Sequence, residues 1–250
     1  MKAIIVAAGP GSRLNHLTRD KPKCLLKVGG QTIMERTLGA LRANGIEDIS
    51  VVRGWQSHLI DFPGLTYYHN PDFKDNNILV SLFYAEEAMT DDFVFSYSDI
   101  IYTEETVARL LRSEADVAAV VDVNWAEQYV ERDQHPISEA ELVKTVDGRI
   151  VKIGKEEVTP EEAHGEFVGL VKFTIAGAEL MKVAYHHASE NHDRPFHHAA
   201  SLRKAYMTDM LQELVDRGIR MDSVDIEGGW SEIDTPQDLA KAQHQFENSG

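Results

Sequence analysis

The feature that most constrains the fold is an apolar run that passes directly into a glycine loop at the start of the chain. Residues 3–8 are all apolar, and Gly9-Pro10-Gly11 follows at once. A segment that is apolar on both faces predicts a buried parallel strand, here over residues 2–8. A helix over residues 32–44 and a second strand over 48–54 complete the pattern. Together they predict a right-handed βαβ unit.

The same alternation continues through the first half of the chain and then changes. Strands are expected at 65–69, 93–97 and 116–123, with helices at 78–88 and 104–112. In the second half we expect strands at 142–146, 150–153, 167–173 and 221–226, with helices at 175–189, 199–217 and 235–247. The alternation predicts one α/β domain over residues 1–250 with a Rossmann-like, doubly wound mixed sheet. Insertions belong to its second half, residues 124–250, rather than to residues 1–123.

Charge and cysteine content exclude several classes of partner. The formal net charge is -16, from 41 acidic and 25 basic residues. Such a surface repels nucleic acid and anionic membranes, so neither is expected as a partner. The one cysteine, Cys24, excludes an intrachain disulfide and suits a reducing compartment. With no apolar run of signal or membrane-spanning length, we expect a cytoplasmic protein.

Basic residues are concentrated beside the first loop, against the trend of the whole chain. Arg13, Lys21 and Lys23 lie within eleven residues. The loop lacks the third glycine of dinucleotide-binding motifs, because Leu14 stands there, and it lacks a Walker A lysine. A glycine turn with solvated lysines is the alternative. The position of the loop, at the carboxyl end of the first strand, favours phosphate binding.

These residues also carry a resemblance. Ala7-Ala8-Gly9-Pro10-Gly11-Ser12-Arg13-Leu14, followed by Lys21-Pro22-Lys23-Cys24-Leu25, resembles the signature of sugar-phosphate and cytidylyl nucleotidyltransferases. The resemblance implies a nucleotide-diphospho-sugar transferase fold, with the NTP on residues 1–123 and the acceptor on residues 124–250. It implies that the backbone of residues 7–11 holds base and ribose. It also implies catalytic roles for Arg13, on the leaving phosphates, and for Lys23, on the α-phosphate.

Two aspartates are candidate metal ligands. Asp99 ends an expected strand, and Asp234 precedes the closing helix. Taken alone, each is explained as a strand-end or helix-capping residue. The resemblance matches both, through Phe-x-Tyr-Ser-Asp and Trp-Ser-Glu-Ile-Asp-Thr-Pro, to ligands of Mg²⁺. The acceptor oxygen would attack the α-phosphorus in line with pyrophosphate, and catalysis would be positioning and charge neutralisation.

The acceptor side is read mainly from the resemblance. Lys155 follows a hairpin and by itself reads as a solvated edge-strand lysine. The resemblance to sugar nucleotidyltransferases, in which a lysine after this strand contacts the acceptor phosphate, implies that role for Lys155. The resemblance to phosphocholine and phosphonate cytidylyltransferases covers nearly the whole chain. Glu166 is expected to receive an amine or a hydroxyl. Tyr206 and Asp209 are expected to bind an acceptor ammonium or simply to pack. Asn77 is expected either to cap a helix or to contact nucleotide or acceptor.

The sequence therefore predicts a CTP-dependent cytidylyltransferase that uses Mg²⁺ and a small phosphonate or phosphocholine-like acceptor. The alternatives are a sugar-1-phosphate nucleotidyltransferase using UTP or dTTP, and a non-catalytic nucleotide-binding regulatory module. Dimers are common among soluble enzymes, so the sequence leaves both a homodimer and a monomer open. For His186-His187, His192 and His197-His198 a solvated role is favoured over a zinc site. The nucleotide site is expected to comprise Ala7, Ala8, Gly9, Gly11, Ser12, Arg13, Lys23, Asn77 and Ser98.

Overall fold

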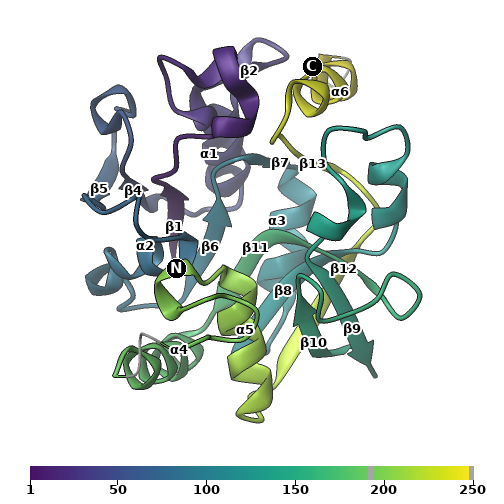
Figure 1. Ribbon diagram of the computed structural model, residues 1–250. Coiled ribbons are helices and arrows are strands. Elements are labelled where there is room, and N and C mark those ends of the chain that lie inside the picture. The colour runs from purple at the N-terminus through teal and green to yellow at the C-terminus, as the bar shows by residue number, and fades with distance from the viewer. Residues whose placement is uncertain (191–193, 248–250) are drawn as a thin grey trace.

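A mixed β-sheet runs through the molecule (Figure 1). The computed structural model describes residues 1–190 and 194–247. Within them nine strands form one sheet in the order β5-β4-β1-β6-β11-β8-β12-β10-β9. Their bounds are β1 Lys2–Ala7, β4 Asp48–Arg53, β5 Leu65–His69, β6 Phe93–Tyr97, β8 Val117–Asp122, β9 Leu142–Val146, β10 Arg149–Gly154, β11 Gly165–Phe173 and β12 Met221–Ile226. Two small antiparallel pairs stand apart, β2 Lys27–Val28 with β3 Gln31–Thr32, and β7 Ile100–Tyr102 with β13 Trp230–Glu232.

The direction of the strands divides the sheet. Strands β5, β4, β1 and β6 are parallel neighbours. Strand β11 then runs antiparallel to both β6 and β8, and β9 and β10 form an antiparallel hairpin. Asp147 and Gly148 turn this hairpin with φ of 51° and 73°, as the Asp-Gly pair predicts. The doubly wound mixed sheet expected from the sequence is confirmed.

Helices cover both faces of the sheet (Figure 1). One face buries Met34, Leu41 and Leu110, and the other buries Leu82 and Met210. The first face is covered by α1 Ile33–Ala43 and α3 Glu104–Arg112, and the second by α2 Ile78–Phe83, α4 Ile175–Ser189 and α5 Met207–Asp216. The last helix, α6 Pro236–Glu247, packs beside β2 and β13.

Helix α6 begins in a reciprocal cap that fixes the residue before it. Thr235 Oγ1 accepts a hydrogen bond from the Asp238 N–H at 3.2 Å. Asp238 Oδ2 accepts from the N–H groups of Thr235 at 2.8 Å and Asp234 at 3.1 Å. Pro236 occupies the first helical position, where its missing N–H costs nothing. The Asp234 side chain is therefore not used as the cap and is left to face other groups.

Two expected helices are shorter than predicted. The helix expected over 78–88 ends at Phe83, and the helix expected over 199–217 begins only at Met207. The second error has a visible cause, because carbonyl groups of the segment before α5 accept hydrogen bonds from the start of α2. The N–H of Asn77 donates to the Arg203 carbonyl at 2.8 Å, and that of Leu79 donates to Ala205 at 3.3 Å. Tertiary pairing thus overrides helix propensity there.

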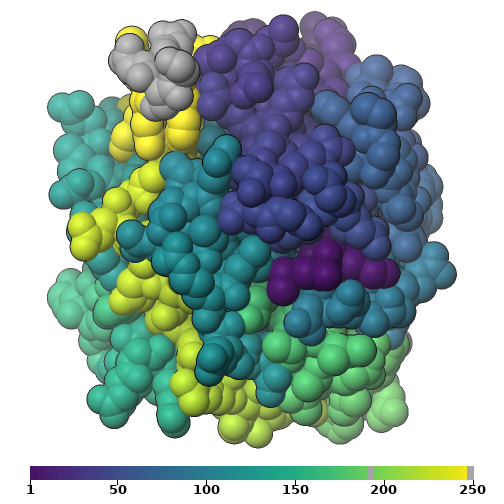
Figure 2. All heavy atoms as spheres, turned by 180° about the vertical axis from the view of Figure 1, so that it is seen from behind, coloured from purple at the N-terminus to yellow at the C-terminus, as the bar shows by residue number. Residues whose placement is uncertain are grey.

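The parallel strands place their carboxyl ends at one edge of the sheet. In Figure 1, β1 runs toward the segment that carries β2. From behind, Figure 2 shows the first residues (purple) flanked by blue and green segments, and the Met1 ammonium lies 3.5 Å from Asp91. No helix within the described residues has the length and apolar character needed to cross a membrane. The loops at the carboxyl edge are where a ligand site is expected.

Candidate active site

The glycine loop after β1 curls back onto Lys23. Gly11 has φ 63° and ψ 44°, in the left-handed region that favours glycine. A Cβ atom built on Gly11 would lie 3.0 Å from Lys23 Cβ, so a larger residue there would push the lysine away. Thr18 Oγ1 donates to the Gly11 carbonyl at 2.8 Å and holds the turn. Pro10 has no N–H, so the loop offers one backbone donor fewer than it otherwise would.

The loop forms one wall of a cavity of about 380 Å³. Its other walls come from the carboxyl ends of β6 and β10, the start of α2, strand β11 and the segment before α6. Segments from both halves of the chain therefore meet at one cavity. Of the residues expected from the sequence to form a site, it brings together Ala7, Ala8, Gly9, Gly11, Ser12, Arg13, Lys23, Asn77, Ser98, Asp99, Lys155, Glu166, Tyr206 and Asp234.

Asp209 is the exception, and the expectation that it contacts the acceptor needs correction. It does not line the cavity. Asp209 Oδ2 accepts the backbone N–H of Tyr206 at 2.7 Å at the start of α5, and only 7% of the residue is exposed. Its carboxylate is committed to helix capping. Tyr206 itself stands just before the helix and faces the cavity.

Lys23 joins the two candidate metal-binding aspartates, which lie far apart in the sequence. Its Nζ lies 2.7 Å from Asp99 Oδ2 and also contacts Asp234 Oδ1. Arg13 Nη2 approaches Asp234 Oδ2 at 2.5 Å. Burial opposes the charge of Lys23, but the two carboxylates outweigh it and hold the pKa of Lys23 above its usual value. Burial alone would raise the pKa of Asp234, whereas Lys23 and Arg13 hold it well below its usual range.

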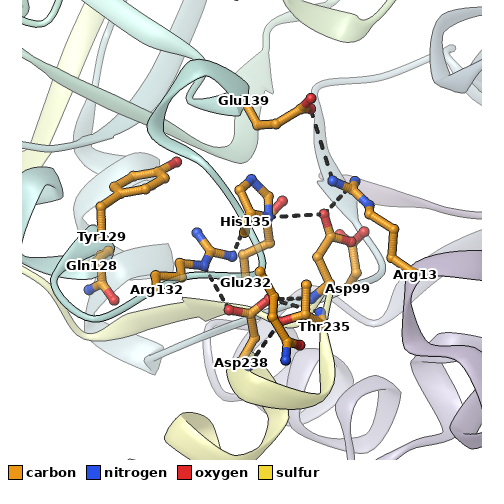
Figure 3. Close-up of polar contacts among 12 residues, drawn as sticks. Arg13, Asp99, Gln128, Tyr129, Arg132, His135, Glu139, Glu232, Thr235 and Asp238 are labelled. Carbon is orange, nitrogen blue, oxygen red and sulfur yellow. Dashed lines mark hydrogen bonds and ion pairs between the residues drawn. The ribbon is translucent and has the colours of Figure 1, made fainter.

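Three further residues, His135, Arg132 and Glu232, belong to this group of polar side chains but were not singled out from the sequence (Figure 3). His135 Nδ1 lies 3.6 Å from Asp234 Oδ2 and 3.7 Å from Glu232 Oε2. Arg132 donates from Nη2 to Glu232 at 3.0 Å and from Nε to Asp238 at 2.7 Å. Burial, with the carboxylates of Asp234 and Asp99, raises the pKa of Glu232 well above its usual value. Burial and then the charge of Arg132 lower the pKa of His135 to about 4.

The residues not singled out from the sequence differ in whether a sequence pattern could have identified them. Glu232 stands two positions before Asp234, so the alternation of an extended chain already puts both on one side. Ile233 between them is fully buried on the other side. His135 and Arg132 lie in a segment of short turns without a strand or helix period. No sequence pattern could have placed them.

The side chains fit a divalent cation. One ligand atom each from His135, Glu232 and Asp234 lies within 4.8 Å of the others. Asp99 Oδ1 and His135 Nδ1 are both buried without a hydrogen-bond partner. Buried polar atoms are rarely left unsatisfied, and carboxylate and imidazole groups are ordinary metal ligands. Asp99 and Asp234 are the residues for which the sequence predicted this role, and the ligand set that would complete it remains a prediction.

The far end of the cavity is lined by carboxylates and aromatic rings. Tyr129 donates to Glu166 Oε1 at 2.5 Å, while Glu166 Oε2 is buried without a partner. Burial raises the pKa of Glu166 to about 7. Glu141 accepts from Tyr97 at 3.2 Å and from Thr208 at 2.7 Å, and burial raises its pKa as well.

Lys155 is the cation at this end. Its Nζ lies 2.8 Å from Glu139 Oε2 and 4.4 Å from the centre of the Tyr206 ring. Only 23% of its side chain is exposed. Lys155 is therefore held in place rather than solvated along an edge strand.

The histidines between residues 186 and 198 form no common cluster among the described residues. His186 pairs with Glu86 at 2.7 Å, and His197 pairs with Glu213 at 2.9 Å. His192 lies outside the described residues. Among the described residues none of these histidines belongs to a group that could hold a metal.

Cys24 is 1% exposed beneath the loop, and burial raises the pKa of its thiol to about 12.

Comparison with known proteins agrees with this geometry. The family model described as "MobA-like NTP transferase domain" matches residues 3–220. The chain belongs to this family. It is therefore a nucleotidyltransferase, as the resemblance of its first loop predicted. Its nucleotidyltransferase fold is confirmed by the solved structure of the CTP:phosphocholine cytidylyltransferase from Streptococcus pneumoniae, with a TM-score of 0.75, 21% identity and 98% of each chain covered.

Relatives of known activity share sequence with this MobA-like chain. The CTP:phosphoglutamine cytidylyltransferase of Campylobacter jejuni is 31% identical over 251 residues, covering 96% of this chain and 98% of the relative. The choline-phosphate cytidylyltransferase of Streptococcus pneumoniae is 30% identical over 106 residues, covering 41% of this chain and 46% of the relative. Both are cytidylyltransferases, and they differ in acceptor.

Proposed function

We propose that this nucleotidyltransferase transfers CMP from CTP to a small phosphorylated or phosphonate acceptor and releases pyrophosphate. The observation that carries the proposal is one cavity that holds Arg13 and Lys23 at the glycine loop and Lys155 on the other side of Glu139 from Arg13. A net charge of -16 makes these local cations the means of holding two anionic substrates. The relatives that use CTP support the choice of nucleotide.

The two loop cations have different tasks in this proposal. Half of the Arg13 side chain is exposed, so it is free to leave Asp234 for the phosphates that depart. Lys23 is 13% exposed and lies between two carboxylates, so it stays at the centre, where charge develops on the α-phosphate. A divalent cation such as Mg²⁺, held by Asp99 and Asp234, would neutralise phosphate charge when bound. No covalent intermediate on the protein is needed.

The acceptor end favours a molecule that carries an ammonium group or another strong donor. Glu166 Oε2 is a buried acceptor atom without a partner, and Glu141 lies in the same cavity. A substrate N–H would satisfy this oxygen and stabilise the carboxylate charge. Lys155 would bind the acceptor phosphate. Tyr206 would pack against the part of the acceptor that links its phosphate to its ammonium group. A sugar phosphate carries no ammonium group and would leave this carboxylate without a charged partner.

The test is a pyrophosphate-release screen with Mg²⁺. CTP, UTP, dTTP, ATP and GTP are each paired with phosphoglutamine, phosphocholine, 2-aminoethylphosphonate, hydroxyethylphosphonate, phosphoethanolamine and sugar 1-phosphates. We expect turnover with CTP and an amine-bearing acceptor. Turnover with sugar 1-phosphates and UTP or dTTP alone would overturn the proposal and leave the family assignment intact. CTP binding without turnover on any acceptor would instead support a regulatory module.

A further inference from the structure

One imidazole beside the metal-binding aspartate has no role in the chemistry proposed so far. Only 3% of the His135 side chain is exposed, and its Nδ1 atom is buried without a hydrogen-bond partner. The atom faces two carboxylate oxygens, one from Glu232 and one from Asp234. Leaving such a buried group unsatisfied is unfavourable, so a ligand is expected at this point.

The distances suit a shared cation better than hydrogen bonds. Nδ1 lies 3.7 Å from Glu232 Oε2 and 3.6 Å from Asp234 Oδ2, longer than any normal N–H···O bond. Bonds of about 2.0–2.2 Å to one ion put neighbouring ligand atoms roughly 3–3.5 Å apart. Both distances from Nδ1 are thus within a few tenths of an ångström of that spacing, and the three ligand atoms all lie within 4.8 Å of one another. We propose that His135, Glu232 and Asp234 form a divalent-cation site with one nitrogen and two oxygen ligands.

A buried arginine holds two parts of this site in register. Arg132 is 6% exposed and donates to both Glu232 and Asp238, which joins the segment carrying His135 to the start of α6 (Figure 3). Glu232 Oε2 keeps a second lone pair for a metal after accepting from Arg132. The imidazole therefore faces carboxylates that are already oriented, as a metal site requires.

Arg13 couples the site to the nucleotide. It occupies Asp234 Oδ2 at 2.5 Å, the same oxygen that faces His135. When Arg13 turns to a triphosphate, that oxygen is released to a cation. This step rests on the proposed function, since it needs an NTP beside Arg13. It follows that CTP increases the affinity for the metal.

A nitrogen ligand changes which metal the site prefers. Mg²⁺ is bound through oxygen, whereas imidazole favours first-row transition metals such as Mn²⁺, Co²⁺ and Zn²⁺. The site should therefore bind these ions more tightly than an all-carboxylate pair would, while still accepting Mg²⁺. His135 is in this respect a residue that determines metal specificity.

The test uses Mn²⁺ as the probe and does not depend on turnover. Pulsed electron paramagnetic resonance of the whole protein with Mn²⁺ and CTP should show a directly coordinated ¹⁴N nucleus. His135→Gln should abolish this coupling and weaken Mn²⁺ binding at least about tenfold, since even indirect partners of a metal contribute that much. Mg²⁺ binding should change less. His164→Gln, which alters a histidine paired with Asp225 outside the cavity, is the matched control.

Two results would overturn the inference. One is Mn²⁺ bound by the wild-type protein with no nitrogen coupling, a measurement that does not depend on any variant folding. The other is an unchanged coupling in folded His135→Gln. Failure of the proposed function looks different, because Mn²⁺ and its nitrogen ligand would remain while no acceptor is turned over with CTP.

Discussion

The two ends of the cavity are built in opposite ways. At the nucleotide end, Arg13 and Lys23 come from one short stretch of chain around a glycine loop. At the acceptor end, Glu139 and Glu141 come from the segment before β9 and Glu166 comes from β11, and Lys155 pairs with Glu139. In the proposed function, the nucleotide end supplies cations to the triphosphate of the NTP. The acceptor end supplies anions, and its scattered construction allows the acceptor to change without disturbing the loop.

The largest effect is expected where the two halves meet, at Asp99. Asp99→Asn should reduce Mg²⁺-dependent pyrophosphate release about a thousandfold or more, because a metal contributes several kcal/mol of charge stabilisation. An unchanged melting temperature would show that the fold is intact. A rate near that of the wild type would break the assignment of Asp99 to the metal.

Next in size is the loss of Arg132, the arginine that holds Glu232 and Asp238 beside the proposed metal site. Arg132→Met leaves Glu232 and Asp238 without their shared donor. Removing one partner from a buried ion pair costs about 3–5 kcal/mol of unfolding free energy. Chemical denaturation measures this value. Arg112→Met, on an exposed side chain, is the control, and equal losses from the two variants would refute a special role for Arg132.

Lys23 tests whether the nucleotide end acts on the chemical step. Lys23→Ala should lower kcat by about 100- to 1000-fold, the effect of losing one aligned charge contact to the transition state. The acceptor KM should stay nearly constant. Lys21→Ala removes a nearby lysine that does not line the cavity and should leave kcat close to normal. A change confined to acceptor KM would show instead that Lys23 acts at the acceptor end of the cavity.

Ionisation of Glu166 at the acceptor end should lower the free energy of unfolding. Its pKa is raised from 4.5 to about 7. Below pH 4.5 the carboxyl is neutral in both folded and unfolded chains, so nothing is lost. Between pH 4.5 and 7 only the unfolded chain ionises, and stability falls. Above pH 7 the full loss, about 3 kcal/mol, is present.

Glu166→Gln keeps the neutral form and should therefore stabilise the free protein at pH 8 by up to about 3 kcal/mol, with little effect at pH 5. Acceptor KM should rise about tenfold and CTP KM should not, since a substrate donor loses a charged partner. Thermal melts at the two pH values and steady-state kinetics measure both effects. Glu161→Gln, at an exposed position, controls for a general change of charge.

The contrast between the two ends also decided what could be read from the sequence. The strand, loop and cations of the nucleotide end are consecutive, so residue type and spacing identified them. Asp234 was found through its motif, although its meeting with Asp99 needed the structure. The segment that carries Arg132, His135 and Glu139 has no helix or strand periodicity. Asp209 was wrongly expected to contact the acceptor, because its capping role depends on where α5 begins. Local patterns record neighbours along the chain, whereas this end is made of neighbours in space.

The buried thiol under the glycine loop has a practical consequence. Cys24 is the chain's one cysteine, and it lines the cavity while almost wholly shielded. A thiolate forms there only when the loop opens to water, so alkylation should be slow and limited by that opening. The rate of Cys24 alkylation, measured by mass spectrometry, therefore reports how often the loop opens. A nucleotide that closes the loop should lower this rate.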